Sequence, residues 1–289
     1  MHLLVITNDR SGSAGAVDPA AVLVERGCVV TTATIAEAAR WRGEVPHGKL
    51  RSIQRVVVAG GDGSVGCAAA LALALDVPLG VVPAGTANDF VRAMELPEDP
   101  ERACVLAATG DRFRDVDVAE IEGQPFVNVA SLGLAPIAAE TAEPLKKRLG
   151  AIAYPVGALV SAIRTRPMPM VAEVDGEPVW AGRAWQAMVA STGAFGGWAS
   201  TGTTRQGDGA LDLVIVPGGR SGRELMFDAH ALVRGELAQR EGVFHARGAQ
   251  IEITTRRAQK VVVDGELTKL DTRTLDARVG DRPVRVVVG

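Results

Sequence analysis

The chain has 289 residues, of which 47% are hydrophobic, and at roughly 150 residues per domain this length predicts about two domains with well-filled cores. Its 31 basic and 34 acidic residues give a formal charge of −3, so the composition does not favour a nucleic-acid-binding protein, which would show a basic excess. The three cysteines form no CxxC pair, which argues against a disulfide framework or a zinc cluster.

The first hundred residues alternate short apolar runs with helical patterns. Apolar runs rich in β-branched residues predict strands at 3–6, 29–32, 56–58 and 79–82. Helices are expected at 19–27, 34–41, 64–75 and 100–110. Because several of these strands are apolar throughout, the pattern predicts a parallel sheet that helices cover on both faces.

After about residue 112 the pattern changes to short strands that are joined by turns. Glu122-Gly123 and Asp175-Gly176 are expected to turn two hairpins. Further strands are predicted at 185–190, 211–216, 251–255, 260–263 and 284–288, and helices at 148–164 and 223–235. We therefore predict an α/β domain over residues 1–115 and a β-rich domain over residues 116–289.

The N-terminus has no basic region that leads into an apolar one, so it does not resemble a signal peptide. The most apolar run, residues 65–75, is too short to span a bilayer, which takes about 20 residues. We expect a cytoplasmic protein that meets membranes, if at all, from the aqueous side.

A glycine-rich turn follows the third predicted strand. Gly60, Gly61 and Gly63 allow backbone amides to approach an anion, and the helix that begins near Ser64 adds its positive end. Asp62 would repel a bare pyrophosphate unless a cation or a reacting hydroxyl lay beside it. The turn therefore favours a phosphoryl-transfer site over a dinucleotide site, and a tight turn without a ligand is the alternative.

A second polar turn, residues 83–90, follows the next strand. Gly85, Thr86 and Asn88 offer backbone, hydroxyl and amide groups to phosphate oxygens. Adjacent parallel strands end at the same edge of a sheet, so both turns are expected to meet around one ligand. The alternative is that Asn88 or Asp89 only caps the following helix.

Five segments occur in a fixed order along the chain. They are GGDGS at 60–64, PAGTANDFVRAMELP at 83–97, FVNVASLGL at 126–134, GDGALDLVIV at 207–216 and VDGEL at 263–267. Together they resemble the diacylglycerol kinase catalytic-domain family, which includes bacterial lipid kinases and sphingosine kinases. The resemblance implies an ATP-binding α/β domain and a β-sandwich-like lipid-binding domain, with ATP and Mg²⁺ in the cleft between them.

The same resemblance implies roles for particular residues. Asp264 would be the general base and Glu266 would help to hold the metal–water network, while Asp62 stays the second candidate for the base. Asn8 and Ser11, after the first strand, would line the nucleotide together with the two glycine turns.

A metal site is expected around Asp208 and Asp212. Similar segments in the family hold a structural Mg²⁺ with a carboxylate and main-chain carbonyls, and hard oxygen ligands suit that ion. A solvated turn before a strand is the alternative. Asp175 repeats the Asp-Gly-Glu string of the Asp264 turn and is expected to be structural.

The chain departs from the family where an Asn-Glu pair usually follows GGDG, because Gly66-Cys67 stands there. The expected function is an ATP- and Mg²⁺-dependent transfer of the γ-phosphate to a hydroxyl of diacylglycerol or a related lipid. It would involve transient contact with a membrane surface and no nucleic acid, with a homodimer left open. The alternatives are a kinase of a soluble alcohol, as NAD kinases are, and a nucleotide-binding regulatory protein without kinase activity.

Overall fold

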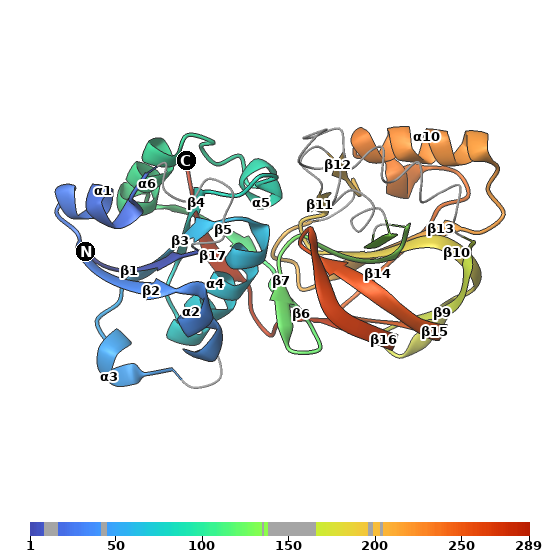
Figure 1. Cartoon of the computed structure of the whole chain (residues 1–289), viewed down its shortest axis with the longest axis horizontal. Helices are drawn as coiled ribbons and strands as arrows, with labels where there is room; N and C mark the ends of the chain where they lie inside the picture. Colours follow the sequence, from blue (N-terminus) through green and yellow to red (C-terminus); the bar gives the residue numbers. More distant parts are fainter. Residues whose placement is uncertain (9–16, 42–44, 135, 138–165, 196–198, 203–204) are drawn as a thin grey trace.

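The computed structural model describes most of the chain. The described segments are residues 1–8, 17–41, 45–134, 136–137, 166–195, 199–202 and 205–289. Ser11 and the helix predicted over 148–164 lie outside them. The described residues form two large sheets that lie side by side along the longest axis of the molecule (Figure 1).

A six-stranded sheet contains the four strands that the sequence predicts for the first hundred residues. They are β1 (His2–Thr7), β2 (Val29–Thr34), β3 (Arg55–Gly60) and β4 (Leu79–Pro83). These strands run parallel in the order β2-β1-β3-β4. The sheet continues with β17 (Val284–Val288), which is parallel to β4, and with β5 (Arg112–Val116), which is antiparallel to β17.

Helices cover both faces of this sheet, as predicted. They are α1 (Pro19–Glu25), α2 (Ile35–Trp41), α4 (Asp62–Leu75) and α6 (Pro100–Thr109), with the shorter α3 (His47–Leu50) and α5 (Asp89–Ala93). Along β1, Leu3 and Val5 pack in one core with α1 and α6, whereas Leu4 and Ile6 pack in another with α2 and α4. Alternate residues of a strand face opposite sides, so a strand buried on both faces is apolar throughout.

Two of these helices begin with the same local signal. The side chain of Asp18 accepts hydrogen bonds from the first turn of α1, and Asp99 does so for α6. Each aspartate precedes a proline, which has no N–H to leave unpaired at the first helical position. The starts of α1 and α6 were therefore predictable from a few neighbouring residues.

The second sheet has nine strands and contains both predicted hairpins. The strands are β6 (Ala119–Ile121), β7 (Gln124–Phe126), β8 (Val129–Gly133), β9 (Met168–Val174), β10 (Glu177–Ala190), β13 (Leu211–Pro217), β14 (Phe244–Gly248), β15 (Gln250–Val263) and β16 (Glu266–Val279). The long strands β10 and β15 each pair with β9 along one half and with β8 along the other. This pairing folds the sheet over on itself around an apolar core.

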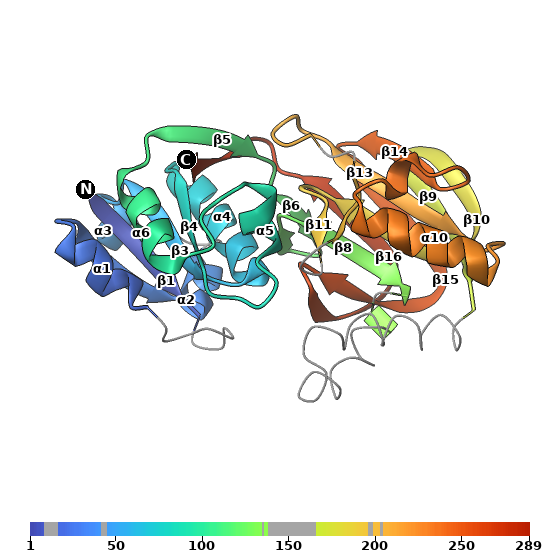
Figure 2. The same cartoon turned by 90° about the horizontal axis from the view of Figure 1, so that it is seen from above.

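Smaller elements complete the second half. Strands β11 (Ala194–Phe195) and β12 (Ala199–Ser200) form a short ladder. Helix α10 (Gly222–Val233) begins with a capping box of Ser221 and Glu224, and η3 (Leu237–Gln239) follows it. Figure 2 shows α10 lying across the outside of the second sheet. None of the described helices is long and apolar enough to span a membrane.

The structure and the sequence prediction differ most in the second half of the chain. The predicted strands 251–255 and 260–263 are one continuous strand, β15, and its partner β16 was not predicted. The strand predicted at 284–288 exists, but it pairs in the first sheet rather than with its neighbours in sequence. The boundary at 115/116 stays a prediction, since the chain passes between the sheets after β5 and returns after β16.

Candidate active site

The two glycine turns meet at one edge of the first sheet. Strands β3 and β4 are neighbours and end at Gly60 and Pro83. The backbone N–H of Ala84 donates to the carbonyl of Gly60 over 3.1 Å. A Cβ added to Gly85 would lie 2.6 Å from the Cα of Gly61, so neither turn has room for a side chain where they touch. The sequence predicted this convergence, and Gly61, Gly63 and Gly85 all lie there.

Asn8 joins the same edge from β1. Its side-chain Nδ2 donates to Ser64 Oγ over 2.9 Å, which links the end of β1 to the first turn of α4. A Cβ on Gly60 would lie 2.6 Å from the Cβ of Ser64, so this contact also requires a glycine. Asn8, Gly60 and Ser64 therefore lie together at this edge of the sheet, and their role in binding a nucleotide stays a prediction.

The side chain of Asn88 shapes its own turn. Asn88 has a left-handed backbone with φ of 50°, and its amide accepts from the N–H of Gly85 at 2.9 Å and donates to the carbonyl of Gly85 at 3.1 Å. Thr86 lies exposed at the tip. Asp89 is buried and pairs with Arg92 at 2.7 Å. Thr86 is thus the side chain of this turn that faces solvent, and Asn88 holds the turn in shape.

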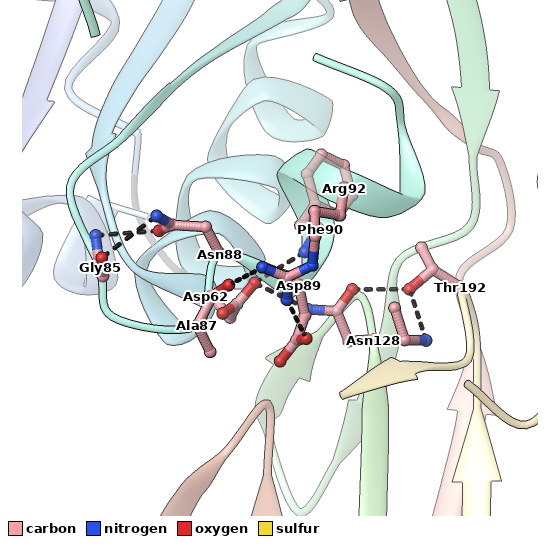
Figure 3. Close-up of polar contacts among 10 residues, drawn as sticks. Asp62, Gly85, Ala87, Asn88, Asp89, Phe90, Arg92, Asn128 and Thr192 are labelled. Carbon is pink, nitrogen blue, oxygen red and sulfur yellow. Dashed lines mark hydrogen bonds and ion pairs between the residues drawn. The ribbon is translucent and has the colours of Figure 1, made fainter. Parts of the chain in front are cut away.

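Asp62 lies where both sheets meet. It is the first residue of α4 and is 7% exposed. Its Oδ1 accepts from the backbone N–H of Phe90 at 2.8 Å and from Asn128 Nδ2 at 3.0 Å (Figure 3). The carboxylate therefore connects α4, α5 and the segment before β8.

Asn128 is a residue to which the sequence analysis gave no role, although it lies in the quoted FVNVASLGL segment. Its Oδ1 accepts from Thr192 Oγ1 at 2.6 Å while its Nδ2 donates to Asp62 (Figure 3). Asn128 and Thr192 are both buried. The only available signal was an amide inside an otherwise apolar run, which is unusual because a buried amide needs hydrogen-bond partners.

Asp264 is held by the backbone of the neighbouring strand. It lies in the turn between β15 and β16, with φ of 47°, and its carboxylate accepts from the N–H groups of Val127, Asn128 and Val129 at 3.0, 2.9 and 3.1 Å. Burial raises the pKa of Asp264 to about 8, the negative charge of Asp62 adds to the rise, and the three N–H donors oppose it. The raised pKa makes this carboxylate a stronger proton acceptor than that of an ordinary aspartate.

Glu266 reaches the first helical turn of α4 from the second sheet. A Cβ on Gly63 would lie 3.2 to 3.3 Å from the carboxyl atoms of Glu266, so the two groups are close although Glu266 is exposed. Asp62, Asp264 and Glu266 therefore gather near the N-terminus of α4, where helix amides favour anions. Proton acceptors and an anion-binding helix end are what phosphoryl transfer to a hydroxyl requires.

Gly66, where the family usually has an asparagine, allows a close contact between the two halves of the chain. A Cβ there would lie 2.8 Å from the carbonyl oxygen of Pro125 and 3.2 Å from the Cα of Phe126. Cys67 is buried beside it in the core of the first sheet. The departure from the family pattern thus coincides with close packing of α4 against β7.

The acids expected to hold a metal ion are neutralised by side chains. Arg247 contacts both oxygens of Asp208, at 3.0 and 2.8 Å, and its Nε lies 3.2 Å from Asp212 Oδ1. His245 Nε2 lies 2.6 Å from the same Asp212 oxygen. No group of three or more candidate ligands occurs in the described part of the chain. The metal role of Asp208 and Asp212 stays a prediction that this geometry does not favour, since an ion would have to displace a guanidinium.

Comparisons with known proteins agree with this architecture. Residues 2–121 match the diacylglycerol kinase catalytic domain, and residues 128–286 match the YegS C-terminal NAD kinase beta sandwich-like domain. A Bacillus subtilis protein named diacylglycerol kinase is 28% identical over 221 residues, covering 75% of this chain and 72% of that protein. A Pseudomonas fluorescens protein named probable lipid kinase YegS-like is 32% identical over 235 residues, covering 78% of this chain and 75% of that protein.

A solved structure shares the fold over almost the whole length of both chains. The crystal structure of a diacylglycerol kinase from Bacillus anthracis is similar with a TM-score of 0.75. The similarity covers 99% of this chain and 96% of that one at 23% sequence identity. At this identity the likeness concerns the fold.

Proposed function

The chain belongs to the bacterial diacylglycerol kinase and YegS-like lipid kinase family, and from this premise we propose that it transfers the γ-phosphate of MgATP to a hydroxyl of diacylglycerol or a related lipid. The observation that carries the proposal is the meeting of the two glycine turns with Asp62 and Asp264 between the sheets. Each half of the chain contributes a part that the other lacks: the first an anion-binding edge, the second a buried proton acceptor.

The proposed reaction uses these parts in one step. The glycine turn at Gly61 and the N-terminus of α4 offer backbone amides to the phosphates, and the turn at Gly85 packs against it. Asp264 takes the proton of the lipid hydroxyl, whose oxygen forms the new bond to the γ-phosphorus while the bond to the β-phosphate oxygen breaks and ADP leaves. Asn128 positions Asp62, and Glu266 would help to hold the Mg²⁺ that accompanies ATP.

The test is transfer from labelled ATP to a panel of acceptors, namely diacylglycerol, sphingosine, glycerol and NAD. We expect a labelled product with diacylglycerol. Asp264→Asn should lower the turnover at least about 100-fold, because general base catalysis contributes about 10²- to 10⁴-fold, while ATP binding by calorimetry persists. Asparagine suits the left-handed backbone at position 264, but its NH2 group cannot accept from the Val127 N–H as Oδ2 of Asp264 does, so the folding of the variant is checked by circular dichroism.

A matched control lies in the chain itself. Asp175 occupies an equivalent turn of the same Val-Asp-Gly-Glu sequence, with φ of 51°, but it is exposed and far along the sheet from the site. Asp175→Asn should therefore keep full activity. Product with soluble alcohols alone would favour the kinase of a soluble alcohol, and ATP binding without any product would favour a regulatory protein.

A further inference from the structure

Helix α10 presents an apolar face to solvent. Met226, Phe227 and Val233 are 72%, 46% and 45% exposed, although burial is the usual state of such side chains. At about 100° per residue they lie within an arc of roughly 120° around the helix. Figure 2 shows α10 on the outside of the second sheet, and its other side packs through Leu225 and Leu232.

Two arginines and a histidine share this arc and carboxylates do not. Arg223, His230 and Arg234 fall between the apolar positions and are exposed. The two acids of the helix lie on other sides: Glu224 closes the capping box, and Asp228 is buried against the arginines at 220 and 240. The guanidinium of Arg223 lies 5.5 Å from the centre of the Phe227 ring. The face is thus apolar and basic in a chain of net charge −3.

A short series of contacts connects α10 to the candidate active site. Thr192, which donates to Asn128, lies two residues before the start of β11. Strand β11 contacts α5 and pairs with β12, and β12 contacts α10. In Figure 1 α5, β11, β12 and α10 follow one another along one edge of the molecule. A surface that binds α10 therefore lies near the region where the two sheets meet.

We propose that this face of α10 docks on an anionic phospholipid bilayer and holds the interdomain site near its lipid acceptor. The apolar side chains are complementary to the acyl chains of the lipids, and the arginines are complementary to their phosphate groups. Helices that lie in a membrane interface combine the same two kinds of side chain. The purpose of the contact rests on the proposed lipid kinase function, but the contact itself does not require turnover.

The test is flotation of the full chain with vesicles of phosphatidylcholine, with and without phosphatidylglycerol. Met226→Gln combined with Phe227→Gln should weaken binding to the anionic vesicles about tenfold or more, because two exposed apolar side chains no longer enter the interface. Arg223→Gln combined with Arg234→Gln should weaken it about fivefold per arginine on anionic vesicles and leave binding to neutral vesicles unchanged.

The controls show whether a loss of vesicle binding is specific to α10 or follows any change of exposed apolar side chains. Val24→Gln with Val29→Gln changes two valines that are 55% and 62% exposed in the first half of the chain, and should bind vesicles as the parent does. All variants should phosphorylate a short-chain diacylglycerol dispersed as monomers at the parental rate.

Three results would be decisive. Parental vesicle binding by both α10 variants would overturn the proposal. So would a parent dimer that the apolar α10 variant converts to monomers without loss of vesicle binding, since the face would then be covered by a second copy. A parent that floats with vesicles through α10 but phosphorylates no acceptor would contradict the proposed function and leave the docking surface standing.

Discussion

At the scale of the residue, the site depends on polar side chains whose partners come from distant parts of the chain. The side chain of Asn128 accepts a hydrogen bond from Thr192 and donates one to Asp62, and its backbone N–H donates to Asp264. All four residues are buried, and leaving one such group unpaired costs about 1 to 3 kcal/mol. Asp264 and Asp175 have the same neighbours in sequence and the same turn. The raised pKa of Asp264 comes from its burial and, in second place, from the nearby charge of Asp62.

The raised pKa predicts the pH dependence of the reaction. Because the pKa of Asp264 is raised to about 8, the base is mostly protonated at neutral pH. The value of kcat/KM should therefore rise about tenfold per pH unit towards pH 8 and level off above it. A pH–rate profile of the parent measures this, with Asp175→Asn as a control that keeps the same profile. A profile that stays flat below pH 8 would remove Asp264 as the base.

At the scale of the element, α4 serves three contacts at once. Its buried strand partner β3 fixes its direction, its N-terminus faces the glycine turns, and its second turn touches β7. The first two contacts follow from a strand, a glycine turn and an apolar helix in sequence. The third depends on Gly66 and Pro125, which are far apart in the chain.

Gly66→Ala tests that contact. In an isolated helix interior this change stabilises by about 1 kcal/mol, but here the new Cβ would lie 2.8 Å from the Pro125 oxygen. We expect a net loss of about 1 to 3 kcal/mol in the free energy of unfolding. We also expect a lower kcat/KM, because Asp62 lies one helical turn before Gly66 on the side of α4 that faces the second sheet. Urea unfolding and steady-state kinetics measure the two effects.

The control for this change is Gly222→Ala. Gly222 is also helical, and a Cβ there meets nothing within 4 Å, so its replacement should cost no stability. A Gly66→Ala protein as stable as the parent would show that α4 and β7 can move apart without cost.

At the scale of the whole molecule, the last strand of the chain returns to the first sheet. β17 lies between β4 and β5 in the first sheet, although the strands of the second sheet, β6 to β10 and β13 to β16, come between β5 and β17 in the sequence. Val284, Val286 and Val287 are almost fully buried there. The first sheet is therefore not a continuous stretch of sequence, because the second sheet is inserted between β5 and β17, and the two halves are expected to fold together.

A chain that ends at residue 283 should lose the stability of the first sheet. Burial of three valines is worth about 5 kcal/mol or more, which is comparable to the whole stability of many domains. We expect loss of the cooperative thermal transition by circular dichroism and rapid proteolysis of the first half. A chain that lacks only Gly289 serves as the control and should melt as the parent does. A cooperative transition in the shorter chain would show that β17 is dispensable.

The sequence by itself determined the local units of this protein: the parallel strands, the capped helices, the two-residue hairpin turns and the glycine turns at the strand ends. These depend on spacing, caps and turn residues within a few positions of one another. Only the tertiary structure decided that β17 enters the first sheet and that Arg247 pairs with Asp208 and Asp212. The resemblance implied Asp264 rather than Asp175 as the base, and the structure buries Asp264 and leaves Asp175 exposed. Asp264 and its partner Val127 lie 137 positions apart, and no local pattern encodes a contact between such distant residues.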